Sequence, residues 1–456
     1  MQKNASARNE LGTKSVGKLL LQFSVPSMIS MLVNSLYNLV DQIFIGQGVG
    51  YLGNAATNVA FPFVTLSLAL ALLVSDGCAA NMSLSLGAGD QEKANKGLAG
   101  SLLLAATFGI LLFAVGSIFL TPLLRLFGST ETVLPYAQDY TRITLLGMPF
   151  VIVSITLSAV IRADGSPRYA MVCMLVGALI NTVLDPLFIF VFRWGVKGAA
   201  WATIIGQFAN FLLTVRYLFR LRHVRLVRKY VRYDLRIMGH VCLLGISSFI
   251  NQVAIMLVQI VVNNTVTRYG AQSIYGADIP LTCFGIVMKV NQIIAAFIIG
   301  IGSGAQPIVG FNYGAGQYAR VRRTYALAVS AATFFSVVGF LVFQLIPDKI
   351  ILLFGQENAL YNEFAVLCFR RVLLCVFALG FQMVTSGFFQ SIGKAKISAL
   401  LSLSRQVMFL IPLMLLLPLA FGLNGALFAF PIADTAAALL AAVFVVRELR
   451  LLRAKD

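Results

Sequence analysis

The segment WGVKGAAWA at residues 194–202 returns as FGLNGALFA at residues 421–429, 227 positions later. Two shorter matches keep this offset, since LFG at 126–128 matches 353–355 and GAG at 87–89 matches 314–316. The offset falls to about 218 between the first helices of the two halves, which indicates an insertion near residues 275–284. The second half of the chain therefore repeats the first.

The composition is that of a membrane protein. Of the 456 residues, 59% are hydrophobic and 11% are charged, and the mean hydropathy is +0.87. Apolar runs of roughly 20 residues, each long enough to cross a bilayer as a helix, recur along the chain. We predict an all-α integral membrane protein with twelve transmembrane helices in two pseudo-symmetric six-helix bundles. The predicted spans are 19–45, 55–80, 97–120, 136–162, 169–192, 198–219, 239–265, 283–310, 322–346, 362–390, 397–419 and 424–447.

The duplication also predicts how the bundles are arranged. An even number of spans in each half gives both halves the same orientation, so the repeats are parallel and related by an axis along the membrane normal. Two such bundles enclose a path, which favours a transporter over a simple anchor. The predicted parts are an N-terminal segment (1–18), an N-lobe (19–219), a linker (220–238), a C-lobe (239–447) and a C-terminal segment (448–456).

The net charge of +18 is unevenly distributed. Most Lys and Arg residues fall on the side of the N-terminus, which predicts a multi-pass protein of the cell membrane with both termini in the cytoplasm. The basic stretch between the sixth and seventh spans is interpreted as an orientation signal that contacts anionic membrane lipids, with partner binding as the alternative. We expect no nucleic-acid partner. The stretch contains Arg216, Arg220, Arg222, Arg225, Arg228, Lys229, Arg232 and Arg236.

Cysteine and histidine give no sign of a cofactor. The six cysteines lie in or beside apolar spans without a CxxC pair, so neither a disulfide framework nor a metal site is expected. His223 and His240 lie in or near the basic stretch, away from any acidic cluster in the sequence. We expect a protein that needs no cofactor, apart from a possible coupling ion, and that functions as a monomer.

Polar residues inside the spans carry the functional prediction, because a carboxylate there costs about 2.5–3.5 kcal/mol on insertion scales. Helical spacing places them on one face of each of three N-lobe helices. These stripes are Asn34, Tyr37, Asn38 and Asp41 on the first helix, Asn181 and Asp185 on the fifth, and Thr203, Gln207 and Asn210 on the sixth. Pro186 follows Asp185 and removes a backbone donor.

If the three stripes converge, Asp41, Asn181, Asp185 and Thr203 form an oxygen-rich site suited to Na⁺, a hard cation. The same carboxyl groups could instead carry a proton, so the sequence does not distinguish H⁺ from Na⁺. The alternative is that each acid only hydrogen-bonds a neighbouring helix and stabilises the fold.

The second half lacks this acidic stripe. Its seventh helix carries Gln252, Met256, Gln259 and Asn263, and we expect the first three of these residues, with Asn34, Tyr37, Asn38 and Gln207, to line a substrate cavity. Asp76 suggests a structural or gating role near the cytoplasmic end, and Asp434 stands alone in its span. Lys289 and Arg370 fit either a wet cavity face or anchoring at the membrane surface.

With these features in place, the chain resembles the multidrug and toxic compound extrusion (MATE) family over about residues 15–450. The residues that carry the resemblance are Pro26, Asp41, the two GAG turns, the stretch 162–165 and, most specifically, the run NTVLDP at 181–186. The resemblance implies an antiporter that exports organic, often cationic, drugs in exchange for H⁺ or Na⁺. It also implies an N-lobe-coupled bacterial or archaeal type, with the coupling ion near Asp41, Asn181, Asp185 and Thr203.

One departure and three alternatives remain. Some members of the family have an acidic pair in the second lobe, where this chain has Gln252, Gln259 and Gln382, so a cation site of that type is not expected. A lipid-linked saccharide flippase would share the architecture but predicts a more cationic cavity. A membrane-embedded enzyme would need a motif such as HExxH or GxSxG, which the sequence lacks. A channel would not need acids concentrated in one lobe.

Overall fold

The computed structural model describes residues 11–49, 51–127, 129, 131–276, 278–352 and 359–454. In these ranges the chain forms helices joined by short turns, with no strand. This follows from the apolar composition, because a helix satisfies its own backbone hydrogen bonds where no water is available.

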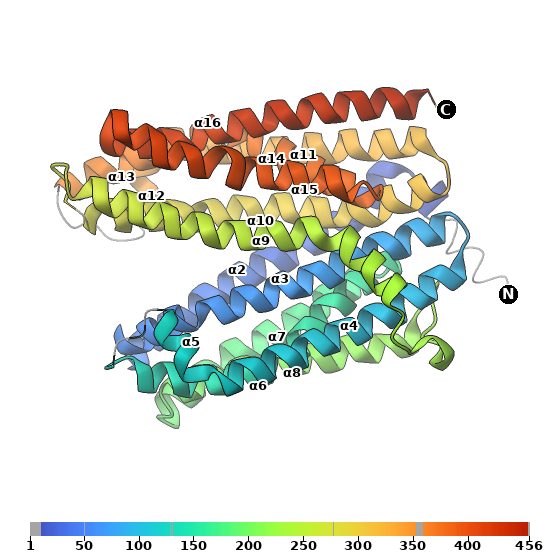
Figure 1. The fold of residues 1–456 in the computed structure, drawn as a ribbon, viewed down its shortest axis with the longest axis horizontal. Helices are drawn as coiled ribbons and strands as arrows, with labels where there is room; N and C mark the ends of the chain where they lie inside the picture. Colours follow the sequence, from blue (N-terminus) through green and yellow to red (C-terminus); the bar gives the residue numbers. More distant parts are fainter. Residues whose placement is uncertain are drawn as a thin grey trace.

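The helices form two bundles (Figure 1). The N-lobe contains α2 (Val16–Val49), α3 (Tyr51–Gly87), α4 (Gln91–Ile118), α5 (Leu120–Leu126), α6 (Leu134–Ala163), α7 (Pro167–Pro186) and α8 (Val196–Tyr217). The C-lobe contains α9 (Leu235–Gly270), α10 (Asp278–Gly314), α11 (Tyr318–Leu345), α12 (Pro347–Leu352), α13 (Ala359–Val372), α14 (Phe377–Ser391), α15 (Ala395–Leu403) and α16 (Ile411–Arg453).

The two ends of the described chain, near the start of α2 and the end of α16, lie at the same end of the molecule, on the right in Figure 1, which we call the termini end. The predicted fold class is confirmed, although several of the predicted spans are not single α-helices. The fifth continues from α7 into the π-helix η1 (Leu187–Val191). The tenth is divided into α13 and α14, which meet at a bend of 46°. The eleventh comprises α15, the π-helix η4 (Ser404–Leu410) and the start of α16, and the twelfth is the rest of α16 beyond a break at Gly422.

The sequence repeat is also a backbone repeat. Gly195, in the first copy of the opening segment, has φ 55° and ψ −133°, and Gly422, its counterpart, has φ 56° and ψ −140°. An L side chain rarely adopts this conformation, so glycine is required at both positions. The short helices α5 and α12 also occupy equivalent positions in the two halves.

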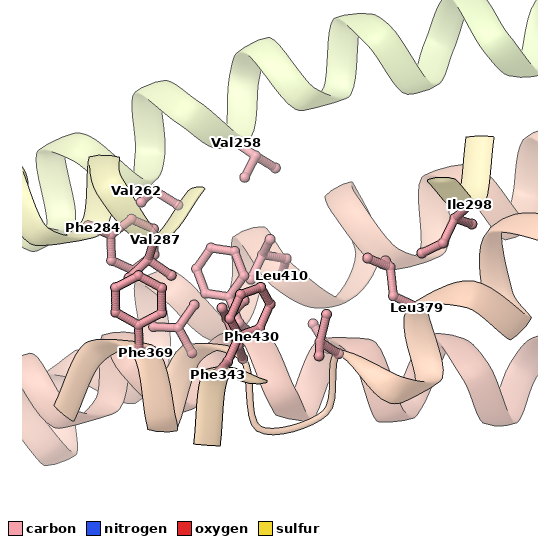
Figure 2. Close-up of a cluster of buried hydrophobic side chains, with 14 of the residues drawn as sticks. Val258, Val262, Phe284, Val287, Ile298, Phe343, Phe369, Leu379, Leu410 and Phe430 are labelled. Carbon is pink, nitrogen blue, oxygen red and sulfur yellow. The ribbon is translucent and has the colours of Figure 1, made fainter. Parts of the chain in front are cut away.

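The largest buried hydrophobic cluster fills the C-lobe (Figure 2). It includes Phe284, Phe343, Phe369 and Phe430, and it also takes in four residues from the beginning of the chain, namely Leu11, Leu19, Leu20 and Phe23. The first turns of the chain are thus packed into the core of the opposite lobe. Conversely, Val241 near the start of α9 is buried in a cluster of N-lobe residues.

Small residues let the helices of the two lobes touch. A Cβ added at Gly77 on α3 would overlap the backbone oxygen of Val241, and a Cβ added at Gly245 on α9 would overlap that of Leu73. Gly87 on α3 and Gly314 on α10 make an equivalent mutual contact. Backbones approach this closely only where side chains are absent, as at small-residue crossings of membrane helices.

The contacts between the lobes are concentrated at the termini end. Among the described residues, the interlobe hydrogen bonds and the closest backbone approaches fall in the nearer halves of α2, α3, α9 and α10 or at their margins. Of the closest backbone approaches, those of Gly300 with Met28 and of Gly245 with Leu73 lie farthest along the helices from the termini end. The lobes are therefore joined at one end of their interface.

The linker between the lobes is fastened to the N-lobe. Asp164, at the end of α6, is fully buried and accepts hydrogen bonds from the backbone amides of Arg222 (2.8 Å) and His223 (2.9 Å) and from the hydroxyl of Tyr217 (2.9 Å). His223 Nδ1 also lies 3.3 Å from Asp164 Oδ1. His223 lies away from acidic residues in the sequence, and folding brings it to one carboxyl group, that of Asp164, 59 positions earlier.

Farther along the linker, Tyr233 hydrogen-bonds Thr107 on α4 at 2.8 Å. Asp234 then caps α9 by accepting from the backbone amides of Arg236 and Ile237 at 3.1 and 3.3 Å. Most of the linker thus runs along the N-lobe before α9 begins.

Candidate functional site

The three polar stripes of the N-lobe lie on helices that pack together. α2 packs against α7, and α7 packs against α8. Asn181 and Asp185 are one turn apart on α7, and both are buried, with exposed fractions of 3% and 0%. Thr203 faces them from α8, and Asp41 approaches from α2. The structure thus brings together the four residues that the sequence predicts for the coupling site.

Asn181 lies at the centre of this cluster. Its side-chain amide is 3.3 Å from Thr203 Oγ1 and 3.4 Å from Asp185 Oδ1. We assign the orientation in which the amide nitrogen donates to Asp185 Oδ2 and the amide oxygen accepts from the backbone and hydroxyl of Thr203, each at 3.3 Å. Asn181 therefore ties α7 to α8 and helps to hold the Asp185 carboxyl group in place.

Asp41, on α2, completes the cluster. Its carboxyl group lies within interaction distance of the Asp185 carboxyl group. Asp41 Oδ1 is buried, and no described residue forms a hydrogen bond with it. A buried oxygen without a partner normally signals an ion, a proton or a water molecule. The two carboxyl groups, with Asn181 and Thr203, therefore offer a set of hard oxygen donors that fits Na⁺ and could equally hold a proton.

The backbone is irregular beside Asp185. Pro186 has no N–H to donate within α7, and the next five residues form the π-helix η1 (Leu187–Val191). Short π-helical turns of this kind occur frequently at functional sites. The sequence anticipated the missing donor but not the π-helix.

Tyr140 on α6 is a site residue that the sequence analysis missed. It is buried, with 8% of its surface exposed, and it lies near Asp41, Asp185 and Tyr37. Its phenol adds a further oxygen and an aromatic wall to the acidic cluster. Tyr140 lies in a polar stretch at the start of its span, between Asp139 and Thr141, and it does not belong to any of the three polar stripes, so no pattern in the sequence singles it out.

The remaining predicted residues divide between the two lobes. Asn34 and Tyr37 lie on α2 with Asp41, and Gln207 lies on α8 against Gly147 of α6. The Asn38 side chain is outside the described part of the structure. Gln252, Met256 and Gln259 lie on α9, and none of the hydrogen bonds described for them reaches the acidic cluster. Gln259 is exposed and donates to Asn263 at 3.1 Å.

Asp434, whose role the sequence leaves open, has a partner from the preceding span. Arg405 of η4 donates through Nε to Asp434 Oδ1 on α16 at 2.7 Å. The side chains are 16% and 7% exposed, so the C-lobe contains a largely buried ion pair. Its two residues are 29 positions apart on successive spans, and only packing brings them together.

Asp76 also has partners. It accepts a hydrogen bond of 2.6 Å from Ser248 in the C-lobe, and Arg162 of α6 is close enough to interact with it electrostatically. Lys289 is exposed on α10, which begins at Asp278 and not at 283 as predicted. Arg370 is exposed at the end of α13, and its carbonyl oxygen accepts from Gln344 at 2.9 Å.

Comparison with known proteins identifies the family. The MatE family model matches residues 26–187 and 248–416. The multidrug export protein MepA of Staphylococcus aureus (strain bovine RF122 / ET3-1) is 25% identical over 436 residues, covering 95% of this chain and 94% of its own. An FAD transporter of Shewanella oneidensis is 26% identical over 433 residues, covering 94% of each chain.

Solved structures show the same fold. A multidrug resistance MATE family transporter in an outward-facing conformation aligns with a TM-score of 0.90 and 23% identity, covering 98% of both chains. A MOP superfamily transporter from Pyrococcus furiosus, whose binding pocket is described as reversed in polarity, gives the same TM-score and identity over 97% of this chain and 98% of that one. The chain therefore belongs to the MatE family of multidrug and toxic compound extrusion transporters, and it is a multi-pass secondary transporter and not an enzyme.

Proposed function

We propose that this transporter exports organic, often cationic, compounds by antiport with H⁺ or Na⁺. The observation that carries the proposal is the cluster of Asp41, Asn181, Asp185 and Thr203, which lies in one lobe of a duplicated scaffold. A buried pair of acids in a membrane bundle is costly unless it serves an ion, a proton or a charged substrate.

The antiport cycle follows from the position of this cluster. Asp41 and Asp185 bind the incoming ion, and the organic compound leaves the cavity toward the same side. Asn181 and Thr203 hold the Asp185 carboxyl group in place during the exchange. Because binding is reciprocal, the ion and the compound must weaken each other's binding by the same factor.

We also propose the orientation of the molecule. The termini end faces the cytoplasm of the cell, and the contacts between the lobes at that end correspond to a state open to the outside. In support, seven cationic residues of the basic stretch are exposed, and none forms an ion pair with a described acid; they are Arg216, Arg220, Arg222, Arg225, Lys229, Arg232 and Arg236. This surface fits the anionic lipids of the cytoplasmic leaflet.

The test is transport by the purified protein in liposomes. Ethidium, an organic cation, should move when a proton gradient or a Na⁺ gradient is imposed, and the gradient that drives it identifies the coupling ion. D41N and D185N should each lower this movement by at least about tenfold, a typical coupling strength. D139N is the matched control, because Asp139 belongs to an exposed N-lobe ion pair with Lys197 at 3.2 Å.

Two results would oppose the proposal. Full gradient-driven transport by D41N and D185N would remove the role of the cluster. Movement of FAD but not of ethidium would instead favour an anionic substrate, as in the Shewanella oneidensis relative. A lipid-linked saccharide flippase would move neither compound in response to either gradient.

A further inference from the structure

We infer that Asp76 and Ser248 form a polar latch that holds the two lobes together at the termini end. The inference rests on the alternating access proposed above. Asp76 lies on α3 in the N-lobe and Ser248 on α9 in the C-lobe, and neither belongs to the cluster around Asp185. The Ser248 hydroxyl donates to Asp76 Oδ2 at 2.6 Å, a length typical of a strong hydrogen bond to a carboxylate.

The latch is supported from both lobes. Gln390 on α14 donates to Ser248 Oγ at 3.1 Å and to the Leu244 carbonyl oxygen at 3.1 Å, so it holds Ser248 on the C-lobe side. Gln306 on α10 reaches the Asp76 carbonyl oxygen at 3.4 Å. On the N-lobe side, Ser75 lies 3.5 Å from Asp76 Oδ1, and Arg162 interacts with Asp76 electrostatically.

The backbones cross in direct contact beside this hydrogen bond. Gly77 follows Asp76 immediately, and Gly245 lies one turn before Ser248. A Cβ at either glycine would overlap the opposite helix, so the backbones of α3 and α9 are in contact beside the Asp76–Ser248 bond. The two helices therefore cannot separate at this end without breaking that bond. The bond therefore reports whether the termini end is closed.

The symmetry of the chain supports a specific role. At the 227-residue offset Asp76 corresponds to Ser303, and at the 218-residue offset Ser248 corresponds to Ser30. Ser30 donates within its own helix to the Pro26 carbonyl oxygen at 2.9 Å. The duplicated scaffold therefore supplies two equivalent crossings, and only one of them carries a carboxyl group bonded across the lobes. The Asp76 carboxyl group is paired with Ser248 when the lobes are closed, and water can hydrate it when they part. Both states of the crossing are therefore accessible, as expected for a contact that opens and closes.

The experiment measures the conformational equilibrium directly. Spin labels are placed at Lys93 and Lys396, which are exposed at the termini end of the two lobes, after replacement of the six cysteines. A second pair at Leu126 and Ile274, which are 78% and 75% exposed, reports the opposite end. Pulsed electron paramagnetic resonance then gives the distance distribution for each pair.

S248A should raise the ratio of open to closed states at the termini end by about tenfold, because it removes a hydrogen bond to a charged group. The Leu126–Ile274 distances should shorten in the same variant. S248T, which keeps the hydroxyl, should restore the original ratio. Adding S248A to D76A, which removes the acceptor, should change nothing further, as expected for two partners of one bond.

S30A is the matched control and should leave both distributions unchanged. The inference is overturned if S248A does not shift the Lys93–Lys396 distances, if S30A shifts them equally, or if S248A and D76A act additively. These distances do not depend on which compound or ion is transported. Failure of the latch is therefore distinguishable from failure of the proposed antiport.

Discussion

Removing one member of the Arg405–Asp434 pair should destabilise the protein far more than removing both. The two side chains meet at 2.7 Å and are 16% and 7% exposed, so R405M leaves a nearly buried carboxylate without its partner. Breaking a buried ion pair in this way costs about 3–5 kcal/mol. The double variant R405M/D434L replaces both charges with apolar groups and should recover most of this loss, because such replacements are often neutral or stabilising.

The assay is equilibrium unfolding in mixed detergent micelles, followed by circular dichroism as the share of denaturing detergent increases. K197M is the matched control. Lys197 pairs with Asp139 at 3.2 Å, but these side chains are 56% and 48% exposed, so the change should cost less than about 1 kcal/mol. The reasoning is refuted if R405M is as mild as K197M, or if the double variant is as unstable as R405M alone.

Two further predictions concern the backbone and the linker. G195A and G422A should each destabilise the protein by about 1–3 kcal/mol in the same assay, because both glycines share a strained conformation, whereas G239A, inside α9 with open space around it, should be neutral or slightly stabilising. Unequal costs at the two sites would contradict their structural equivalence. D164A should make trypsin cleave the basic linker at least about tenfold faster, since it leaves two linker amides without their acceptor. D139N serves as the control, and unchanged cleavage in D164A would show that other contacts hold the linker.

The apolar spans and the sequence repeat together predicted the fold, because similar segments at a fixed spacing favour similar structures. The repeat even extends to the dihedral angles of Gly195 and Gly422. Helical spacing also placed Asn181 and Asp185 on one face, and the packing of α2, α7 and α8 then brings Asp41 and Thr203 to them. Local periodicity identifies a face of a helix, whereas the packing of helices decides which faces meet.

The sequence could not reveal pairings between residues distant in the chain. Asp76 and Ser248 are 172 positions apart, and although Ser248 precedes Gln252 by one helical turn, nothing in the sequence indicates that its partner is Asp76. Arg405 follows an apolar run, so its position in the π-helix η4 opposite Asp434 depends on how α15 and α16 pack. Tyr140 is an ordinary aromatic residue in sequence and becomes part of the acidic cluster only through the position of α6.

The exchange of first turns between the lobes has a mechanical consequence. Leu19, Leu20 and Phe23 at the start of α2 are packed in the C-lobe, and Val241 at the start of α9 is packed in the N-lobe. The two packed bodies therefore do not coincide with the two sequence repeats. The chain passes from one body to the other within α2 and within α9. When the lobes part at the termini end, α2 and α9 must either flex or pull these turns out of the opposite core. In the proposed alternating-access cycle, the bending is therefore expected within α2 and α9, and the linker, already fastened to the N-lobe, does not have to supply it.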